Sequence, residues 1–173
     1  MGKLKGPSRI MILKLDVNVK THNNTGPNVR IWFNGSVCYE DINLCELKSY
    51  NIVLDDLQDI NFLFVEHYGK NPNNLPHGED IAVEIDQVMF DQVKLHRNLL
   101  YQQYLFPNWQ FGETPSFVFN NCYLGYNGVW QFVFPKNPIS WIMDYVESEN
   151  FQNQQQTSSG PESNLDDFID MFD

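Results

Sequence analysis

Four carboxylates stand close together near the centre of the 173-residue chain, where they could bind a metal ion. They lie between residues 79 and 86 and are Glu79, Asp80, Glu84 and Asp86. Ca²⁺ takes about six to eight oxygen ligands, often several carboxylates together with loop carbonyls. On one strand Asp80 and Glu84 would lie roughly 13 Å apart, which is too far to share one ion. This separation counts against a shared site; the candidate calcium ligands are Glu79, Asp80 and Asp86, and the alternative is that Glu84 and Asp86 simply face solvent as ordinary strand residues.

Flat aromatic side chains are the second group that could do chemistry, because their faces stack on the apolar faces of sugar rings. The candidates for ligand binding are Trp32, Tyr68 and Trp109. Trp32 has the opposite parity to its neighbours Ile31 and Phe33, so a strand would turn it outward. Tyr68 and Trp109 fall in expected loops. The alternative is that these rings pack in the core or under loops, as most do in a chain with 14% aromatic residues.

The residue pattern contains no recognisable catalytic motif. The four histidines (His22, His67, His77 and His96) lack the spacing of zinc ligands. The chain also has no Gly-x-Ser-x-Gly elbow and no Gly-rich phosphate loop followed by Lys. We therefore expect a protein that is not an enzyme.

Alternating apolar and polar residues predict the strands that would position these groups. The period is two in segments 13–19, 29–33 and 81–85. Segment 36–42 is the expected partner strand of 29–33, segment 50–54 is a further strand, and segment 60–67 is apolar enough to be buried on both faces. Asn34-Gly35 favours a tight hairpin turn. A change of parity near Asp86-Gln87 predicts a bulge or a turn, and residues 68–79 are a long loop by composition.

The second half of the chain is less regular. Residues 95–106 fit a strand or a short helix, segments 116–124 and 129–134 suggest a hairpin, and 138–146 fit one or two helical turns. Many short alternating segments separated by turns are typical of an all-β sandwich or barrel. We expect a flexible arm at 1–8, one β domain at 9–146, a disordered linker at 147–163 and a docking segment at 164–173.

The charge of the chain is concentrated at its C-terminal end. The formal net charge is −11, and residues 147–173 hold seven acids and no Lys or Arg, which leaves 15 acids and 11 bases, a charge of −4, in the preceding part. That balance argues against broad contact with nucleic-acid phosphates. Three cysteines and the lack of a signal peptide or a long apolar span favour the cytoplasm of the producing cell and no membrane contact.

The last ten residues combine acids with an apolar helical stripe. Apolar residues recur at the spacing i, i+3, i+4 and i+7, and the segment that we expect to dock on a partner protein comprises Leu165, Asp166, Asp167, Phe168, Ile169 and Phe172. So short a helix is marginal in water, so it would form against a groove with a basic rim. The segment resembles the acidic C-terminal tips of single-stranded-DNA-binding proteins. The alternative is a solubilising tail without a partner.

The order of features between residues 20 and 93 resembles calcium-dependent carbohydrate-binding modules of the xylan-binding type. Gly26-Pro27 precedes an alternating strand, Asn34-Gly35 takes the place of the hairpin, and Asp80 and Asp86 bracket segment 81–85. The resemblance implies a jelly-roll-like antiparallel β-sandwich, calcium and a carbohydrate ligand. The later motifs Leu124-Gly125-Tyr126-Asn127-Gly128-Val129-Trp130 and Pro138-Ile139-Ser140-Trp141-Ile142 resemble uncharacterised proteins of tailed phages, which implies a virion component.

These observations predict a non-enzymatic binding or structural module of a phage particle, held to a neighbouring protein by its C-terminal segment. One alternative is a single-stranded-DNA-binding protein with aromatic side chains stacked on bases. It would need a basic groove, for which the candidates are Lys3, Lys5, Arg9, Lys14, Lys20 and Arg30. Another is a carbohydrate-binding adhesin.

Overall fold

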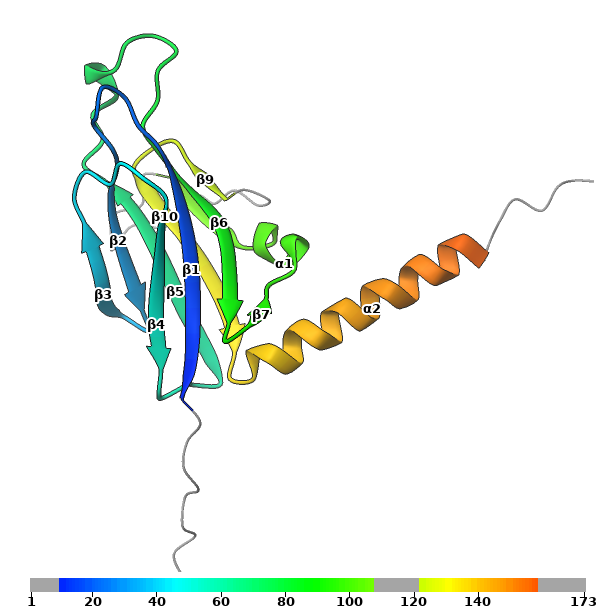
Figure 1. Cartoon of the computed structure of the whole chain (residues 1–173). Coiled ribbons are helices and arrows are strands. Elements are labelled where there is room, and N and C mark those ends of the chain that lie inside the picture. Colours follow the sequence, from blue (N-terminus) through cyan, green and yellow to red (C-terminus); the bar gives the residue numbers. More distant parts are fainter. Residues whose placement is uncertain (1–9, 108–121, 159–173) are drawn as a thin grey trace, which may run out of the picture.

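Two antiparallel β-sheets packed face to face form the body of the protein in a computed structural model, which describes residues 10–107 and 122–158 (Figure 1). The first sheet has the order β4 (Lys48–Leu54), β1 (Met11–Lys20), β6 (Ala82–Phe90), β7 (Val93–Lys94), and β9 (Tyr123–Leu124) also pairs with β6. The second has the order β3 (Ser36–Asp41), β2 (Asn28–Phe33), β5 (Ile60–Tyr68), β10 (Gly128–Pro135), β8 (Tyr104–Pro107). The remaining elements are the 3-10 turn η1 (Pro72–Asn74) and the helices α1 (Arg97–Tyr101) and α2 (Pro138–Ser158).

The predicted antiparallel β-sandwich is confirmed, and the chain crosses repeatedly between the sheets as a jelly-roll-like winding requires. The alternating segments became strands because each buries one face: β1 turns Leu13, Leu15 and Val17 into the core. Leu63 and Val65 of β5 face them from the second sheet, within one continuous apolar core.

Two local features follow the sequence closely. Asn34 and Gly35, with φ of 45° and 85°, both take the left-handed conformation that joins β2 to β3 as a tight turn. The parity change in the central stretch is a bulge, because Val17 pairs with Ile85 while the preceding Asp16 pairs with Gln87. Asp86 is the extra residue, so β6 stays one bent strand.

The predicted hairpin before residue 135 is wrong in the part of it that the structure describes. β9 pairs with β6 in the first sheet, whereas β10 lies between β5 and β8 in the second. The turn at residues 125–127 therefore carries the chain from one sheet to the other. Composition marks such a turn but does not say which sheet each flank joins.

Helix α2 is much longer than the one or two turns expected, and it covers residues 147–158 of the expected disordered linker. Asn137 accepts the first helical hydrogen bond, from Trp141, and Pro138 starts the helix. Ile142 is buried against the body, so the first turns supply the nucleus. Glu and Gln then extend the helix because their propensity for it is good. A polar composition is therefore compatible with helix in this segment.

The sandwich has two unlike ends (Figure 1). Residues 69–81 arch over one end, next to the end of β5 and the start of β10. Met11 and the start of α2 lie at the opposite end, where Pro135 pairs with Ile60. In the described part of the chain, no helix has the length and apolar character needed to cross a membrane.

Candidate functional site

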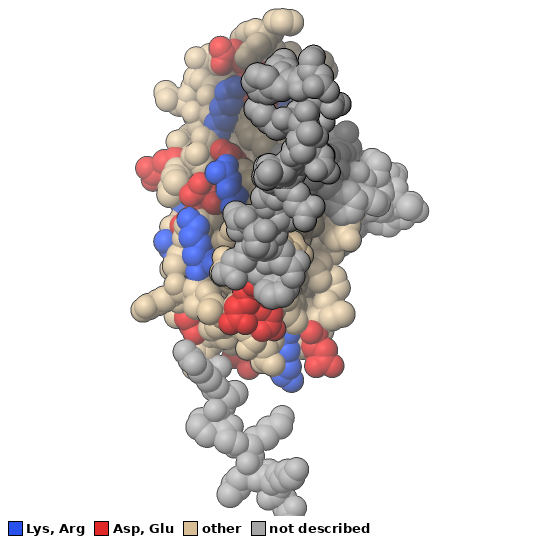
Figure 2. Space-filling model, turned by 90° about the vertical axis from the view of Figure 1, so that its right-hand side faces the viewer, with Lys and Arg blue, Asp and Glu red and all other residues tan. Residues whose placement is uncertain are grey.

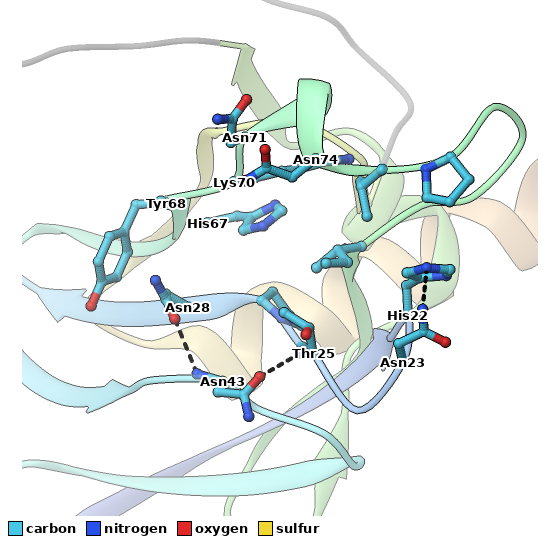
Figure 3. Close-up of a pocket in the computed structure, with 16 residues that line it drawn as sticks. His22, Asn23, Thr25, Asn28, Asn43, His67, Tyr68, Lys70, Asn71 and Asn74 are labelled. Atoms are coloured by element: carbon cyan, nitrogen blue, oxygen red, sulfur yellow. Dashed lines mark hydrogen bonds between the residues drawn. The ribbon is translucent and has the colours of Figure 1, made fainter.

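A cleft of about 540 Å³ opens at the end of the sandwich under residues 69–81 (Figure 3). One wall is the loop before β2, with His22 and Thr25, and another is the loop after β5, with Asn71 and Asn74. Most of the labelled side chains carry amides, hydroxyls or imidazoles, so the lining offers both donors and acceptors. None of the lining residues that the structure describes is Asp, Glu or Cys.

Asparagine side chains build the wall before β2 by replacing regular backbone pairing. The side-chain oxygen Oδ1 of Asn43 accepts a hydrogen bond from the backbone N–H of Gly26 at 2.7 Å. The backbone N–H of Asn43 donates to the side-chain oxygen Oδ1 of Asn28 at 3.0 Å. Leu44 donates its amide to the Pro27 carbonyl at 2.9 Å. Asn43 itself has φ of 58°, a conformation that asparagine tolerates better than most residues. These bonds hold the wall in place without a sheet ladder.

His67 forms the floor of the cleft. It continues the inward row of β5 after Leu63 and Val65, and Figure 3 shows its ring pointing into the space between the loops. The residue is 1% exposed. Its Nδ1 donates to the Leu124 carbonyl at 3.1 Å, so Nε2 is the acceptor nitrogen of a neutral ring. Burial lowers the pKa of His67, and the carbonyls of Leu124 and Tyr126 oppose this only in part.

The acceptor nitrogen of His67 has no hydrogen-bond partner within residues 10–107 and 122–158. A buried polar atom without a partner costs about 1–3 kcal/mol. Such atoms are rare in folded proteins. This one lies beneath a polar cleft and is almost wholly covered, so a ligand donor could reach it only if the side chains around it move.

The expected metal ligands are not brought together. Asp80 accepts hydrogen bonds from the Lys70 ammonium and from the Tyr123 hydroxyl, the latter at 2.6 Å. Glu79 lies 3.2 Å from the imidazole of His22. Asp86 is exposed on the β6 bulge, and six strand residues from Asp80 correspond to roughly 20 Å. In the described residues no group of three or more His, Cys, Asp or Glu is placed to hold a metal ion.

The residues therefore do not fit calcium as the sequence suggested. Asp80, the one expected ligand with a buried share of carboxylate, already neutralises an ammonium group. A calcium ion at Asp80 would have to displace that cation, and Glu79 and Asp86 belong to other surroundings.

Trp32 and Tyr68, two of the expected sugar-stacking residues, flank one arginine on the outer face of the second sheet. The Arg30 guanidinium lies 5.7 Å from the ring centre of Trp32 and 4.5 Å from that of Tyr68. Arg30 also pairs with Glu40 at 2.6 Å and with Glu66 at 3.2 Å. Only Tyr68 of the two aromatic residues reaches the cleft, at its edge (Figure 3).

In this arginine cluster the charged groups of Arg30, Glu40 and Glu66 pair with one another. The Tyr68 hydroxyl donates to Glu40 at 2.6 Å. Hydrogen bonds from Tyr68 and Arg30 lower the pKa of Glu40, and the hydrogen bond to Glu40 raises the pKa of Tyr68. Trp32 donates its indole N–H to Glu66 at 3.2 Å. The cluster therefore fixes the orientation of both rings, of which Tyr68 lies at the edge of the cleft.

The remaining expected site residues lie outside the described ranges: Trp109, and the docking residues Leu165, Asp166, Asp167, Phe168, Ile169 and Phe172. His67, Lys70 and the asparagines of the cleft were not among the residues predicted from the sequence. The density of Asn in segments 23–28 and 71–74 was the one available signal, because amides gathered in long loops are typical of polar ligand contacts.

A scan of protein-family models finds no match to the chain, and neither does a search of curated proteins. A search of solved structures matches two chains. One is vCBM60, from work on a circular permutation that provides an evolutionary link between two families of calcium-dependent carbohydrate-binding modules. It matches at 13% identity with a TM-score of 0.45, over 70% of this chain and 89% of that one. The other is vCBM60 in complex with galactobiose, at 14% identity and a TM-score of 0.45, covering 70% and 96%. Neither of them bears on xylan or on phage particles.

Proposed function

We propose that the protein is a non-catalytic binding module whose cleft takes a neutral, hydroxyl-rich ligand, namely an oligosaccharide. The observation that carries the proposal is the unpartnered acceptor Nε2 of His67 at the floor of the cleft. A sugar hydroxyl can donate to it while accepting from a neighbouring amide, because a hydroxyl is both donor and acceptor.

The charges around the cleft favour a neutral ligand over a charged one. His67 is neutral, Lys70 is paired with Asp80, and the His22 ring lies against Glu79. A charged ligand would leave its own charge without a partner in the cleft, which is costly where water is partly excluded. The lining amides of Asn71 and Asn74 can instead bond hydroxyl groups at no charge cost.

The composition of the lining also supports binding without hydrolysis. Glycosidases commonly act through a pair of carboxyl groups on either side of the scissile bond. The described lining residues carry no carboxyl group.

Removing two polar side chains of the cleft should weaken oligosaccharide binding. Asn74→Ala and Thr25→Ala each remove one polar group of the cleft whose side chain forms no hydrogen bond with another residue of the ranges 10–107 and 122–158. We expect each to raise the dissociation constant about 3- to 10-fold and the double variant more than about 10-fold. The measurement is titration calorimetry with a neutral oligosaccharide selected from a glycan array that includes galactobiose and xylobiose.

Asn51→Ala is the matched control, because Asn51 is exposed on β4 in the first sheet and outside the cleft. It should bind like the unchanged protein. Failure of every neutral oligosaccharide to bind at millimolar concentration, or equal binding by the cleft variants and the control, would show that the proposal is wrong.

Single-stranded DNA is a weaker candidate ligand. Two of the basic side chains expected to line a groove already form ion pairs within the protein. Lys14 pairs with Asp16, and Arg30 pairs with Glu40 and Glu66. On the face shown in Figure 2, acidic and basic side chains are interleaved. Retention on single-stranded DNA that falls steeply with salt would nevertheless favour it over the oligosaccharide.

We also propose, from the sequence alone, that residues 164–173 dock the module on a neighbouring protein of a phage particle. A chain ending at Gly160 should lose a partner that the full chain retains on co-purification. Phe168→Ala with Phe172→Ala in the full chain should lose it too, because both are on the apolar stripe. Equal recovery of the partner with all three chains would contradict this role.

A further inference from the structure

An ammonium group stands where the sequence suggested a metal ion. The Lys70 side chain is 7% exposed, and its Nζ donates to Asp80 Oδ1 and to the Gly125 carbonyl oxygen. The second Asp80 oxygen accepts from Tyr123. A carboxylate and a carbonyl are the oxygen ligands that a hard cation such as calcium prefers, and here they surround a side chain of the protein itself.

We propose that the Lys70 ammonium is the built-in structural cation of the cleft wall, so that the protein holds this wall without a bound metal ion. The inference rests on contacts within the chain and does not depend on which ligand the cleft binds.

The contacts of Lys70 join three segments that are distant in sequence. Its side chain ties the start of the loop after β5 to Asp80 at the end of that loop and to Gly125 in the turn between β9 and β10. Its backbone is held as well, because the Asn127 side chain accepts from the Lys70 amide and donates to the Lys70 carbonyl, both at 2.8 Å. Residues 71–76 of the same loop supply a wall of the cleft, so Lys70 positions that wall.

The cluster is packed closely around the ammonium. A Cβ on Gly125 would lie 3.0 Å from Asp80 Oδ2 and 2.9 Å from the Tyr123 ring. Burial alone would raise the pKa of Asp80, but hydrogen bonds from Lys70 and Tyr123 lower it, so the carboxylate is ionised at neutral pH. Its charge is matched by one ammonium, and a divalent ion at the same place would meet a fixed positive charge.

The first test compares the unchanged protein in EDTA and in millimolar CaCl₂ by thermal unfolding. We expect the two midpoints to agree within about 1 °C, because a cation that binds the folded state would raise the midpoint by mass action. A midpoint more than about 3 °C higher in calcium overturns the proposal. This readout involves no oligosaccharide, so its failure is separate from failure of the proposed function.

The second test removes the ammonium. Lys70→Met should lower the thermal midpoint by about 6–12 °C, because it leaves Asp80 as a partly buried charge without its cation. Asp80→Asn should do the same by stranding Lys70. The double variant should lose clearly less than the sum of the two, since residues in one ion pair are coupled.

Lys14→Met is the matched control, because the Lys14 side chain is 38% exposed and pairs with Asp16 outside the cleft. It should shift the midpoint by less than about 2 °C. Additive losses in the double variant, or a loss for Lys70→Met no larger than that of the control, overturn the proposal. Recovery of Lys70→Met by calcium would support it, since the metal would then occupy the place of the lost ammonium.

Discussion

His67→Asn is expected to weaken oligosaccharide binding at least about 10-fold and leave the fold intact. An asparagine amide can take the place of Nδ1 and still donate to the Leu124 carbonyl, but it has no atom at the place of Nε2. The ligand hydroxyl would then lose a buried acceptor, which costs about 1–3 kcal/mol or more. Titration calorimetry measures the affinity, and thermal unfolding should show a midpoint within about 4 °C of the unchanged protein.

His67→Gln is the reciprocal variant. Its longer side chain places an amide near the position of Nε2 but no longer matches Nδ1, so it should lose more stability and less affinity than His67→Asn. If His67→Asn bound as tightly as the unchanged protein, the orphan nitrogen would have no role in recognition, and the proposed function would lose the observation that carries it.

Gly26→Ala is expected to have the largest effect on stability. A Cβ on Gly26 would lie 1.8 Å from the Leu44 carbonyl oxygen and 2.5 Å from its carbon, so two backbone segments would have to separate. That movement would break the bonds of Asn43 and Pro27 that build the cleft wall. We expect the free energy of unfolding to fall by about 4 kcal/mol or more, the midpoint by about 8–16 °C, and oligosaccharide binding to be lost.

The control for this change is Gly35→Ala in the turn between β2 and β3. No atom lies within 4 Å of a Cβ there, but φ is +85°, so the cost is backbone strain alone, about 1–2 kcal/mol. The turn is at the end of the sandwich away from the cleft, so binding should persist. Similar losses for both variants would mean that close approach to Leu44 does not matter.

The strands were predictable because their signal is local. In β1 and β2 the period-two pattern names the buried face, and in β6 the change of parity at Asp86 marks the bulge. The Asn34-Gly35 turn needs only the conformational freedom of its two residues. Each of these features depends on neighbours in the sequence.

The site was not predictable in the same way, because it depends on which segments meet. Lys70, Asp80 and Gly125 are brought together by the crossing of the chain between the sheets, and no spacing in the sequence announces it. His67 looked like the last residue of a buried strand, and it is the last buried residue of β5. Its unpartnered nitrogen becomes visible only once the partners of Nδ1 and the shape of the cleft are known.

The central carboxylates predicted a metal site because calcium sites commonly use carboxylate ligands. The structure gives each of them another surrounding: Asp80 meets Lys70, Glu79 meets His22, and Asp86 is on an exposed bulge. The alternating pattern around Asp80 did not reveal that Lys70, ten positions earlier in the chain, would pair with it.

The cleft lies at one end of the sandwich, and both β1 and α2 start from the opposite end (Figure 1). This arrangement affects how the module can be joined to larger assemblies. Glu149 of α2 accepts a hydrogen bond from the Asn98 side chain, and the helix continues for nine more residues, or roughly 13 Å. Attachment to another protein before β1 or after α2 would leave the opening of the cleft pointing away from the point of attachment. Several copies mounted on a common scaffold could therefore present their mouths side by side, and weak individual contacts would add up through avidity.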